Sequence, residues 1–266
     1  MNKKFEINCP PVFNLGLTLD CGQAFRWEEI DEKWHGVAFG KPLIIEQIEN
    51  KIIFDCDEKD FNEVWKNYFD FDCDYEKIVN GYDDKYLVEA VKEFNGIRIL
   101  RQEPWEALCS FIISANNNIP RIKGIVERLC ENFGDGESGR KTFPSAEALA
   151  KLTVEDLAPI RSGFRAKYII DAAKKVADGT VDFKAIEERP IEFGREELQK
   201  IKGVGAKVAE CALLYGFHKI EAFPVDVWVK RIMAEMYPDG LPSCTKGTEG
   251  IAQQYLFHYR RMQDKK

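Results

Sequence analysis

Hydrophobic and polar positions along the chain follow two different patterns, and the change falls near residue 95. From Phe5 to about Phe54, short apolar runs are broken by turn residues, and the segment IIEQIENKIIF at 44–54 predicts a β-hairpin. The segments at 61–69 and 84–94 then place their apolar residues at helical spacing. These patterns predict an N-terminal region of antiparallel strands accompanied by helices.

After about Asn95 the chain changes to a nearly continuous series of helical patterns. The predicted helices are PWEALCSFIISANNN, RIKGIVERLCENF, SAEALAKLT, VEDLAPI, RAKYIIDAAKKVAD, REELQKI, VDVWVKRIMAEMY and a last one near Gly250 to Met262. We therefore expect an α+β protein with two domains, an antiparallel β-rich domain over residues 1–95 and an all-α domain over 96–266. A cleft between the two domains is the expected place for a functional site.

One pair of helical patterns is joined by a turn rich in glycine. The apolar positions on its two sides are Leu198, Ile201, Val204, Val208, Ala212 and Leu213. Gly203 and Gly205 bracket the turn, so the segment reads as a helix-hairpin-helix. Because glycine permits close backbone approach and the second helix presents unpaired N–H groups, the turn suits a DNA phosphate and reads no base. A plain helical connection with a glycine cap explains the same turn equally well.

Two residues near this turn carry candidate chemistry. Lys207 lies in the first turn of the second helix, where the helix dipole disfavours a cation, and a role as nucleophile would explain its presence. A lysine paired with a phosphate or simply solvated is the alternative. Asp226 precedes the apolar positions Val227, Val229 and Ile232, so we expect it to cap a helix. A carboxylate held there is also able to stabilise positive charge that develops on a sugar.

The hairpin, Lys207 and the PVDVW segment at 224–228 resemble the helix-hairpin-helix DNA glycosylases whose Gly/Pro-rich loop ends in aspartate. Four further stretches resemble the 8-oxoguanine DNA glycosylases within that superfamily. They are CGQAFRW at 21–27, SANNNIPRI at 114–122, GFRAKY at 163–168 and AQQYLF at 252–257. Because these stretches follow the order of the family across nearly the whole chain, the resemblance is far more specific than the hairpin alone.

The resemblance implies an all-α glycosylase domain and a bifunctional enzyme. Such an enzyme flips 8-oxoguanine out of duplex DNA, removes it and nicks the abasic strand by β-elimination. Lys207 would attack the anomeric carbon, and Asp226 would stabilise the oxocarbenium-like transition state. No cofactor is expected. A helix-hairpin-helix glycosylase for another damaged purine and a non-catalytic DNA-binding module remain the alternatives.

The same resemblance assigns residues to the DNA duplex. Asn116 is expected to fill the gap left by the flipped base, although a helix-ending turn also explains three consecutive asparagines. Phe164 is expected to act as an apolar wedge in place of the tyrosine common in the family. Arg121 and Arg165 are expected to contact the opposite cytosine. Trp228 stands where better-known members have a histidine near the phosphate, and it is given no role.

A second group of residues is expected around the flipped base. Gly22, with Gln23 beside it, is expected to aim a backbone carbonyl at N7, which is a donor in 8-oxoguanine and an acceptor in guanine. Cys211 and Phe257 are expected on the two faces of the base, and Gln253 at its Watson-Crick edge. A plain turn at Gly22 and ordinary core packing of Phe257 are the alternatives.

Charge is distributed unevenly, which reconciles a net charge of −7 with a DNA substrate. Residues 1–90 hold 10 Lys and Arg against 20 Asp and Glu, whereas the rest of the chain holds 28 against 25. We therefore expect phosphate contacts to come from the region after residue 90.

Cysteine and histidine positions argue against a metal site. The eight cysteines are scattered without a CxxC spacing, so the iron-sulfur cluster of some relatives cannot form, and the three histidines are scattered too. Free thiols and the lack of a signal-like segment predict a soluble intracellular protein. The longest nearly apolar run, at 107–115, is too short to cross a membrane. We expect a monomer that binds double-stranded DNA.

Overall fold

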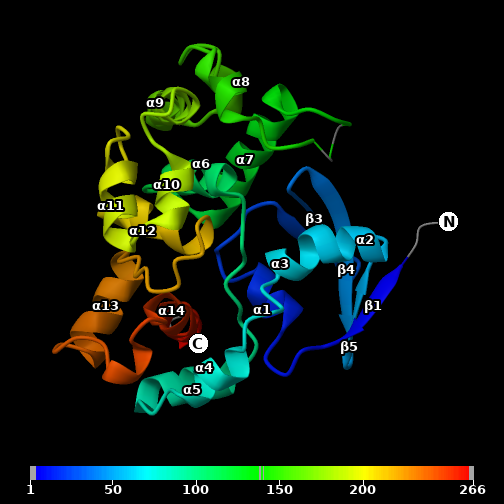
Figure 1. The fold of residues 1–266 in the computed structure, drawn as a ribbon, viewed down its shortest axis with the longest axis vertical. Coiled ribbons are helices and arrows are strands. Elements are labelled where there is room, and N and C mark those ends of the chain that lie inside the picture. The colour runs from blue at the N-terminus through cyan, green and yellow to red at the C-terminus, as the bar shows by residue number, and fades with distance from the viewer. Residues whose placement is uncertain (1–3, 138, 140, 264–266) are drawn as a thin grey trace.

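The computed structural model describes residues 4–137, 139 and 141–263, and it places an antiparallel sheet beside a larger group of helices (Figure 1). The sheet has five strands in the order β1-β5-β4-β3-β2. Their bounds are β1 (Phe5–Asn8), β2 (Trp27–Ile30), β3 (Lys33–Ala38), β4 (Lys41–Ile48) and β5 (Lys51–Phe54). The predicted hairpin is confirmed: Ile48 pairs with Lys51 across a two-residue turn in which Glu49 has φ +49°. The apolar run AFRW enters the sheet only at Trp27, the first residue of β2.

An aromatic core lies beside the sheet. It is built around Phe13, Trp27, Trp34, Phe54, Phe61, Trp65, Tyr68 and Phe69. The helical pattern at 61–69 supplies half of these rings. It forms one continuous helical segment made of α2 (Glu58–Asp60), the π-helical turn η1 (Phe61–Trp65) and α3 (Lys66–Tyr68). A short helix, α1 (Leu15–Leu19), contributes Leu15 and Leu19 to the same core.

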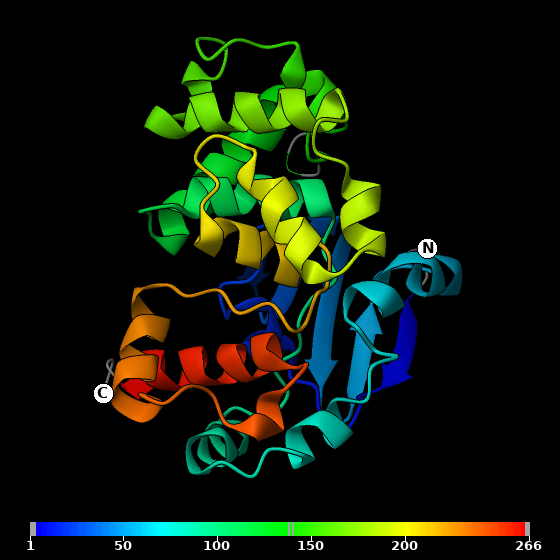
Figure 2. The ribbon, with the colours of Figure 1, turned by 60° about the vertical axis from the view of Figure 1, so that its left-hand side comes forward.

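The last two helices of the N-terminal region pack away from the sheet. These helices, α4 (Tyr75–Asn80) and α5 (Lys85–Glu93), bury residues such as Tyr75 and Leu87 in the second, larger core. Figures 1 and 2 both place them under α14, the last helix, and α5 packs directly on it. A domain boundary near residue 95 stays a prediction, since residues before it contribute to both cores.

The series of helices predicted for the rest of the chain is confirmed. Their bounds are α6 (Pro104–Ser114), α7 (Ile119–Phe133), α8 (Ala146–Ala150), η2 (Ala158–Ile160), η3 (Gly163–Arg165), α9 (Ala166–Ala177), α10 (Phe183–Glu188), α11 (Ile191–Gln199), α12 (Ala206–Tyr215), α13 (Val227–Met236), η4 (Ser243–Thr245) and α14 (Glu249–Gln263). The segment VEDLAPI forms only the 3₁₀ turn η2, because Pro159 cannot donate a helical hydrogen bond and Arg161 turns the chain at φ +56°.

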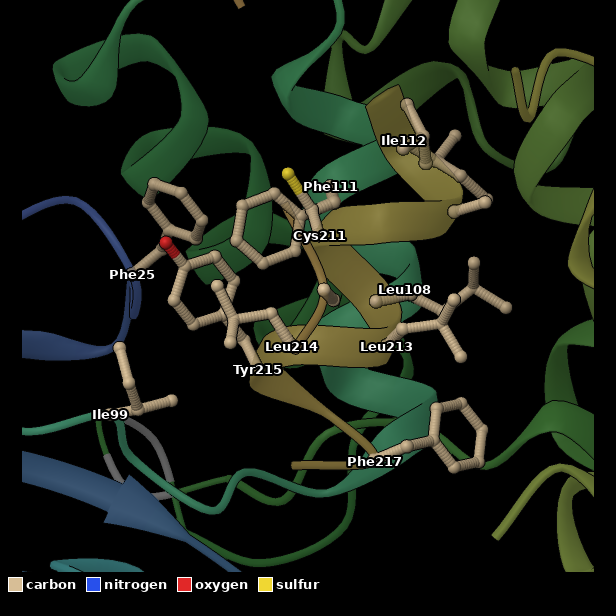
Figure 3. Close-up of a cluster of buried hydrophobic side chains, with 14 of the residues drawn as sticks. Phe25, Ile99, Leu108, Phe111, Ile112, Cys211, Leu213, Leu214, Tyr215 and Phe217 are labelled. Atoms are coloured by element: carbon tan, nitrogen blue, oxygen red, sulfur yellow. The ribbon is translucent and has the colours of Figure 1, made fainter. Parts of the chain in front are cut away.

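Two apolar helices, α6 and α12, form the centre of this region (Figure 3). Helix α12 buries residues on every side from Val208 to Tyr215, and α6 does so from Ala107 to Ile113. A helix that is apolar all round is held firmly by its surroundings. The N-terminal end of α12, where Lys207 lies, therefore has a fixed position.

Candidate active site

The turn between α11 and α12 has the predicted hairpin geometry, with different reasons for its two glycines. Gly203 has φ +82°, and a Cβ at this position would lie 2.5 Å from the Tyr168 ring. Only glycine fits there. Gly205 is the N-cap of α12 with φ −94°, and a Cβ would meet nothing within 4 Å. The open space at Gly205 leaves room for a ligand to approach the first turn of α12.

Lys207 is partly buried in that first turn and points its amine at α6. Its Nζ lies 3.4 Å from the Ser114 hydroxyl oxygen and 5.4 Å from the centre of the Phe111 ring. The amine therefore rests against an apolar ring and a hydroxyl group. This environment differs from that of a lysine surrounded by solvent.

Asp226 is the N-cap of α13, as its position in the sequence predicts. Its Oδ1 accepts hydrogen bonds from the backbone N–H groups of Trp228, at 2.9 Å, and Val229, at 2.8 Å. Both bonds go to the same oxygen. The cap thus fixes the direction of the carboxylate while Oδ2 stays outside the cap.

The charges of Lys207 and Asp226 both affect the pKa of the Cys211 thiol. Burial raises the pKa of its thiol to about 11, the charge and hydrogen bond of Lys207 act in the opposite direction, and the Asp226 carboxylate adds to the rise. The amine and the carboxylate thus shift the pKa of the same thiol in opposite directions. Cys211 and Phe111 belong to the same buried cluster, in which Figure 3 labels both side chains.

Glu210 was not identified from the sequence, although it holds the loop that carries Asp226. Its Oε2 accepts a hydrogen bond from the backbone N–H of Phe223 at 2.7 Å, and its Oε1 accepts one from Arg195 at 2.5 Å. Since Glu210 lies one turn after Lys207 on α12, the helix that carries the amine also anchors the loop. A carboxylate inside an apolar helix was the only sequence signal for this role.

The loop that carries Gly22 runs between α1 and β2. Gly22 has φ +85°, a conformation that favours glycine, and a Cβ there would meet only Ile119, at 3.6 Å. Gln23 is fully buried. Its amide nitrogen donates to the carbonyls of Thr18 and Arg98, and its amide oxygen accepts from the Leu100 N–H. The Gln23 side chain therefore holds the loop in place, and a contact with substrate would require one of these bonds to break.

Helix α14 brings two further predicted residues to this region. The Gln253 side chain is buried, and its Oε1 has no hydrogen-bond donor among the residues that the structure describes. Phe257, one turn later, is only partly buried and lies outside the buried members of the core. A buried acceptor without a donor costs free energy unless a ligand supplies the donor. The Gln253 oxygen is therefore available to a donor from a ligand.

Four of the residues predicted to contact the duplex, Asn116, Arg121, Phe164 and Arg165, form one cluster at the end of α6. Asn116 is exposed with φ +50°. The buried Arg165 guanidinium donates four hydrogen bonds to the carbonyls of Ala115, Asn116 and Ser162, and it lies 4.4 Å from the centre of the Phe164 ring.

Two members of the cluster remain exposed. Phe164 is 52% exposed. Arg121 is exposed as well. Burial and the charge of Arg121 lower the pKa of Arg165, so the two arginines are neighbours. In this structure Arg165 supports the Asn116 turn, and Arg121 is the arginine whose side chain reaches solvent.

A cavity of about 940 Å³ lies elsewhere, between the sheet and α7. Its lining includes Trp27, Val37, Lys123 and Glu127 and none of the predicted site residues. Within the described part of the chain, no group of His, Cys, Asp and Glu is arranged to hold a metal ion. No described helix is both long and apolar enough to span a bilayer.

Comparison with known families agrees with this geometry. Residues 6–108 match the N-terminal domain of 8-oxoguanine DNA glycosylase. Residues 109–243 match the HhH-GPD superfamily of base excision DNA repair proteins. The chain therefore belongs to the HhH-GPD superfamily and, within it, to the 8-oxoguanine DNA glycosylases, which confirms the resemblance found in the sequence.

Alignments with individual relatives include most of the residues of this chain. The N-glycosylase/DNA lyase of Saccharomyces cerevisiae is 34% identical over 260 residues, covering 84% of this chain and 68% of the yeast protein. The structure of MBOgg1 with a low-affinity DNA ligand is 38% identical, with a TM-score of 0.91 and coverage of 98% of this chain and 96% of that one. The Clostridium acetobutylicum 8-oxoguanine glycosylase/lyase, bound to duplex DNA with cytosine opposite 8-oxoguanine, is 36% identical, with a TM-score of 0.87 and coverage of 95% and 93%.

Proposed function

We propose that this protein is a bifunctional enzyme that excises 8-oxoguanine from duplex DNA and nicks the abasic strand by β-elimination. The observation that carries the proposal is that one helix, α12, carries the Lys207 amine and also holds the loop that leads to Asp226, through the hydrogen bond from the Phe223 N–H to Glu210. The amine is held at the start of a buried helix against Phe111 and Ser114, and the carboxylate is fixed by its cap. The relatives named N-glycosylase/DNA lyase support the same activity.

The chemistry follows from these two groups. The bond between C1′ and N9 of the flipped nucleotide breaks, and the base leaves with a proton while the Lys207 amine bonds to C1′. The Asp226 carboxylate stabilises the positive charge that develops on the sugar during this step. Opening of the sugar ring gives a Schiff base. Loss of a C2′ proton then expels the 3′ phosphate and nicks the strand.

Recognition of the base is assigned to the loop at Gly22 and to α14. The Gly22 carbonyl would accept the N7 hydrogen that 8-oxoguanine has and guanine lacks. Cys211 and Phe257 would cover the two faces of the base. The buried Gln253 Oε1, which has no donor in the described part of the chain, would accept from the Watson-Crick edge. Gln23 would act by holding the loop.

Duplex binding is assigned to the hairpin and to the cluster at the end of α6. Gly203 and Gly205 would place backbone N–H groups against a phosphate. Phe164 would wedge the duplex open while Asn116 fills the gap, and Arg121 would reach the cytosine opposite the lesion. Arg165 would support that contact by fixing the turn. The enzyme would act inside the cell as a monomer.

Borohydride trapping tests the proposal. Reduction of the Schiff base on an 8-oxoguanine duplex should give a covalent protein-DNA adduct, and Lys207→Gln should give none because glutamine has no nucleophilic amine. Lys184→Gln, which removes an exposed lysine of α10, is the matched control and should trap like the wild type. If Lys207→Gln forms as much adduct as the wild type, another residue is the nucleophile.

The same assay separates the two alternatives. A wild-type protein that binds DNA but never traps would be a binding module without catalysis. Trapping on a duplex with an alkylated purine, and none on 8-oxoguanine, would identify a glycosylase for a different lesion.

A further inference from the structure

The Gly22 carbonyl lies between two carbonyls that are each held by a glutamine side chain. The Cys21 carbonyl accepts a hydrogen bond from Gln254 Nε2 at 3.1 Å. The Gln23 carbonyl accepts one from Gln102 Nε2 at 2.7 Å. No described residue donates to the Gly22 carbonyl itself. The peptide group in the middle is thus open to a ligand, and its two neighbours are fixed.

The Gln254 side-chain amide can form both of its hydrogen bonds in only one orientation. Its side chain is 2% exposed, and its Oε1 accepts a hydrogen bond of 2.6 Å from the Tyr215 hydroxyl. Because a backbone carbonyl can only accept, the amide nitrogen must face Cys21 and the amide oxygen must face Tyr215. An inverted amide would leave the Cys21 carbonyl without a donor in a buried position.

Gln102 is also held by Tyr215. Its backbone N–H donates to the Tyr215 carbonyl at 3.1 Å, and its side chain is buried. Tyr215 in turn stacks on Phe111, with ring centres 5.1 Å apart and planes 19° apart (Figure 3). Phe111 is the ring against which the Lys207 amine rests. One tyrosine at the end of α12 therefore links both glutamines to the reacting amine.

We propose that Gln254 and Gln102 are positioning residues that fix the direction of the Gly22 carbonyl and so set the preference for 8-oxoguanine over guanine. This inference rests on the proposed function. Glycine has a permissive backbone, so its peptide group would rotate if the flanking carbonyls were free. A hydrogen bond weakens steeply when its angle departs from linearity. A Gly22 carbonyl that points in another direction would therefore no longer accept a strong hydrogen bond from N7–H of the lesion. The two amides suppress that rotation.

The test measures how much affinity each variant loses when the N7 hydrogen is absent. Binding is measured in a Lys207→Gln background, in which the chemistry is blocked. Three duplexes, each with cytosine opposite, carry 8-oxoguanine, its 7-deaza analogue with the C8 oxygen retained, or guanine. Gln254→Met keeps the length and burial of the side chain but neither donates to Cys21 nor accepts from Tyr215.

Gln254→Met should lower the preference for 8-oxoguanine over guanine about tenfold, the equivalent of one well-formed hydrogen bond. Its affinity for the 7-deaza analogue should equal that of the background protein, because the carbon at position 7 of that ligand offers the carbonyl no N–H donor. Tyr215→Phe keeps the stacked ring and the Cys21 contact, so it should fold readily and show a smaller loss of the same kind. Tyr82→Phe, which removes a buried hydroxyl contact to Thr248, is the matched control and should keep the preference.

Two results would overturn the inference. If Gln254→Met and Tyr215→Phe lower the affinity for all three duplexes by one common factor, Gln254 contributes only to the stability of the protein. If the protein with native Gln254 binds 8-oxoguanine and its 7-deaza analogue equally, the Gly22 carbonyl does not discriminate and there is nothing for the amides to direct. Failure of the proposed function is a separate observation, because it would appear as the absence of a borohydride-trapped adduct with the wild type.

Discussion

At the scale of single residues, Asp226 caps a helix, and the proposed function gives the same side chain a chemical role as well. Its Oδ1 caps α13 through the N–H groups of Trp228 and Val229. Capping needs an acceptor oxygen, whereas stabilisation of a cationic sugar needs a negative charge. An amide supplies the first property and lacks the second, so the two roles can be separated by one substitution.

Asp226→Asn should leave the free energy of unfolding within about 1 kcal/mol of wild type, since asparagine is an equally good cap. Single-turnover excision of 8-oxoguanine should fall by about 10²- to 10³-fold, because the charge that stabilises the transition state is lost. Urea denaturation and rapid-quench kinetics measure the two effects. Asp182→Asn makes the same change at the N-cap of α10 and should keep full activity. If Asp226→Asn excises the base at the wild-type rate, Asp226 serves only as the cap of α13.

The positions of Lys207 and Asp226 at the starts of two helices could be predicted because each belongs to a local pattern. Lys207 follows a glycine turn and Asp226 precedes an apolar-periodic helix, and helix ends leave such signals in a few consecutive residues. The burial of Arg165 had no such signal. An arginine before a helix looks the same in the sequence whether it contacts DNA or the carbonyls of a neighbouring turn.

At the scale of elements, α12 is central to the proposed site because it carries Lys207 and Glu210 one turn apart. Lys207 faces α6, while Glu210 holds the loop between α12 and α13 through the N–H of Phe223. The loop continues directly to Asp226. The separation between amine and carboxylate is therefore set by a single helix and one anchored loop.

Glu210→Ala should lower the free energy of unfolding by about 1–3 kcal/mol, because the Phe223 N–H and Arg195 each lose a partner. It should also slow single-turnover excision at saturating DNA, since the loop before Asp226 is no longer anchored. Glu210→Gln retains an acceptor for Phe223 and should recover most of the rate. Excision at the wild-type rate in Glu210→Ala, with only stability reduced, would show that the loop is held by its other contacts.

Arg195→Ala is the matched control for this prediction. It removes the partly exposed ion pair but leaves the Phe223 hydrogen bond, so its effect on stability should stay below about 1 kcal/mol and excision should be unchanged.

Periodicity predicted the long helices and the β4–β5 hairpin, and it failed where elements are short. VEDLAPI has the composition of a helix, yet only one 3₁₀ turn forms around its proline. Helices α1, α4 and α10 were not predicted, because five or six residues contain too little periodicity to distinguish a helix from a turn.

At the scale of the whole molecule, Asp70 joins three distant segments. Its carboxylate lies 3.1 Å from Nε2 of His218, in the loop after α12, and accepts a hydrogen bond of 2.7 Å from Arg101. Its carbonyl accepts a hydrogen bond of 2.6 Å from the Arg98 guanidinium. Asp70 thus ties the end of α3 to the connection before α6 and to the helical region. Sequence patterns could not predict this cluster, since its members are far apart in the chain.

The Asp70 cluster predicts a pH-dependent contribution to stability. Burial raises the pKa of Asp70, but the hydrogen bonds and charges of His218 and Arg101 outweigh it, so the net pKa lies below its ordinary value. The folded state therefore binds the proton less readily than the unfolded state. The stabilisation is fully present above the unfolded pKa of about 4 and is lost as the pH falls through the folded pKa.

Asp70→Asn should lower the free energy of unfolding by about 1–3 kcal/mol at pH 7, and the gap from wild type should narrow below about pH 4. Urea denaturation at pH 7 and pH 3 measures it. Asp83→Asn, which changes an exposed carboxylate, is the control and should change the pH profile little. A gap that stays constant from pH 7 to pH 3 would contradict a role for the charged cluster.

The contact between Gln254 and the Cys21 carbonyl spans 233 residues, and this separation has a consequence for the order in which the protein is made. Ribosomes deliver the chain from its N-terminus at about 5–20 residues per second, so roughly 10–50 seconds pass between the synthesis of the two partners. The aromatic core beside the sheet needs few residues beyond Phe69 and can assemble on the ribosome. The hairpin with Lys207 emerges before α14 does. The proposed function assigns base recognition partly to α14. A nascent chain would therefore complete the hairpin and the Lys207 amine first, and the proposed base-binding residues only when α14 has been added.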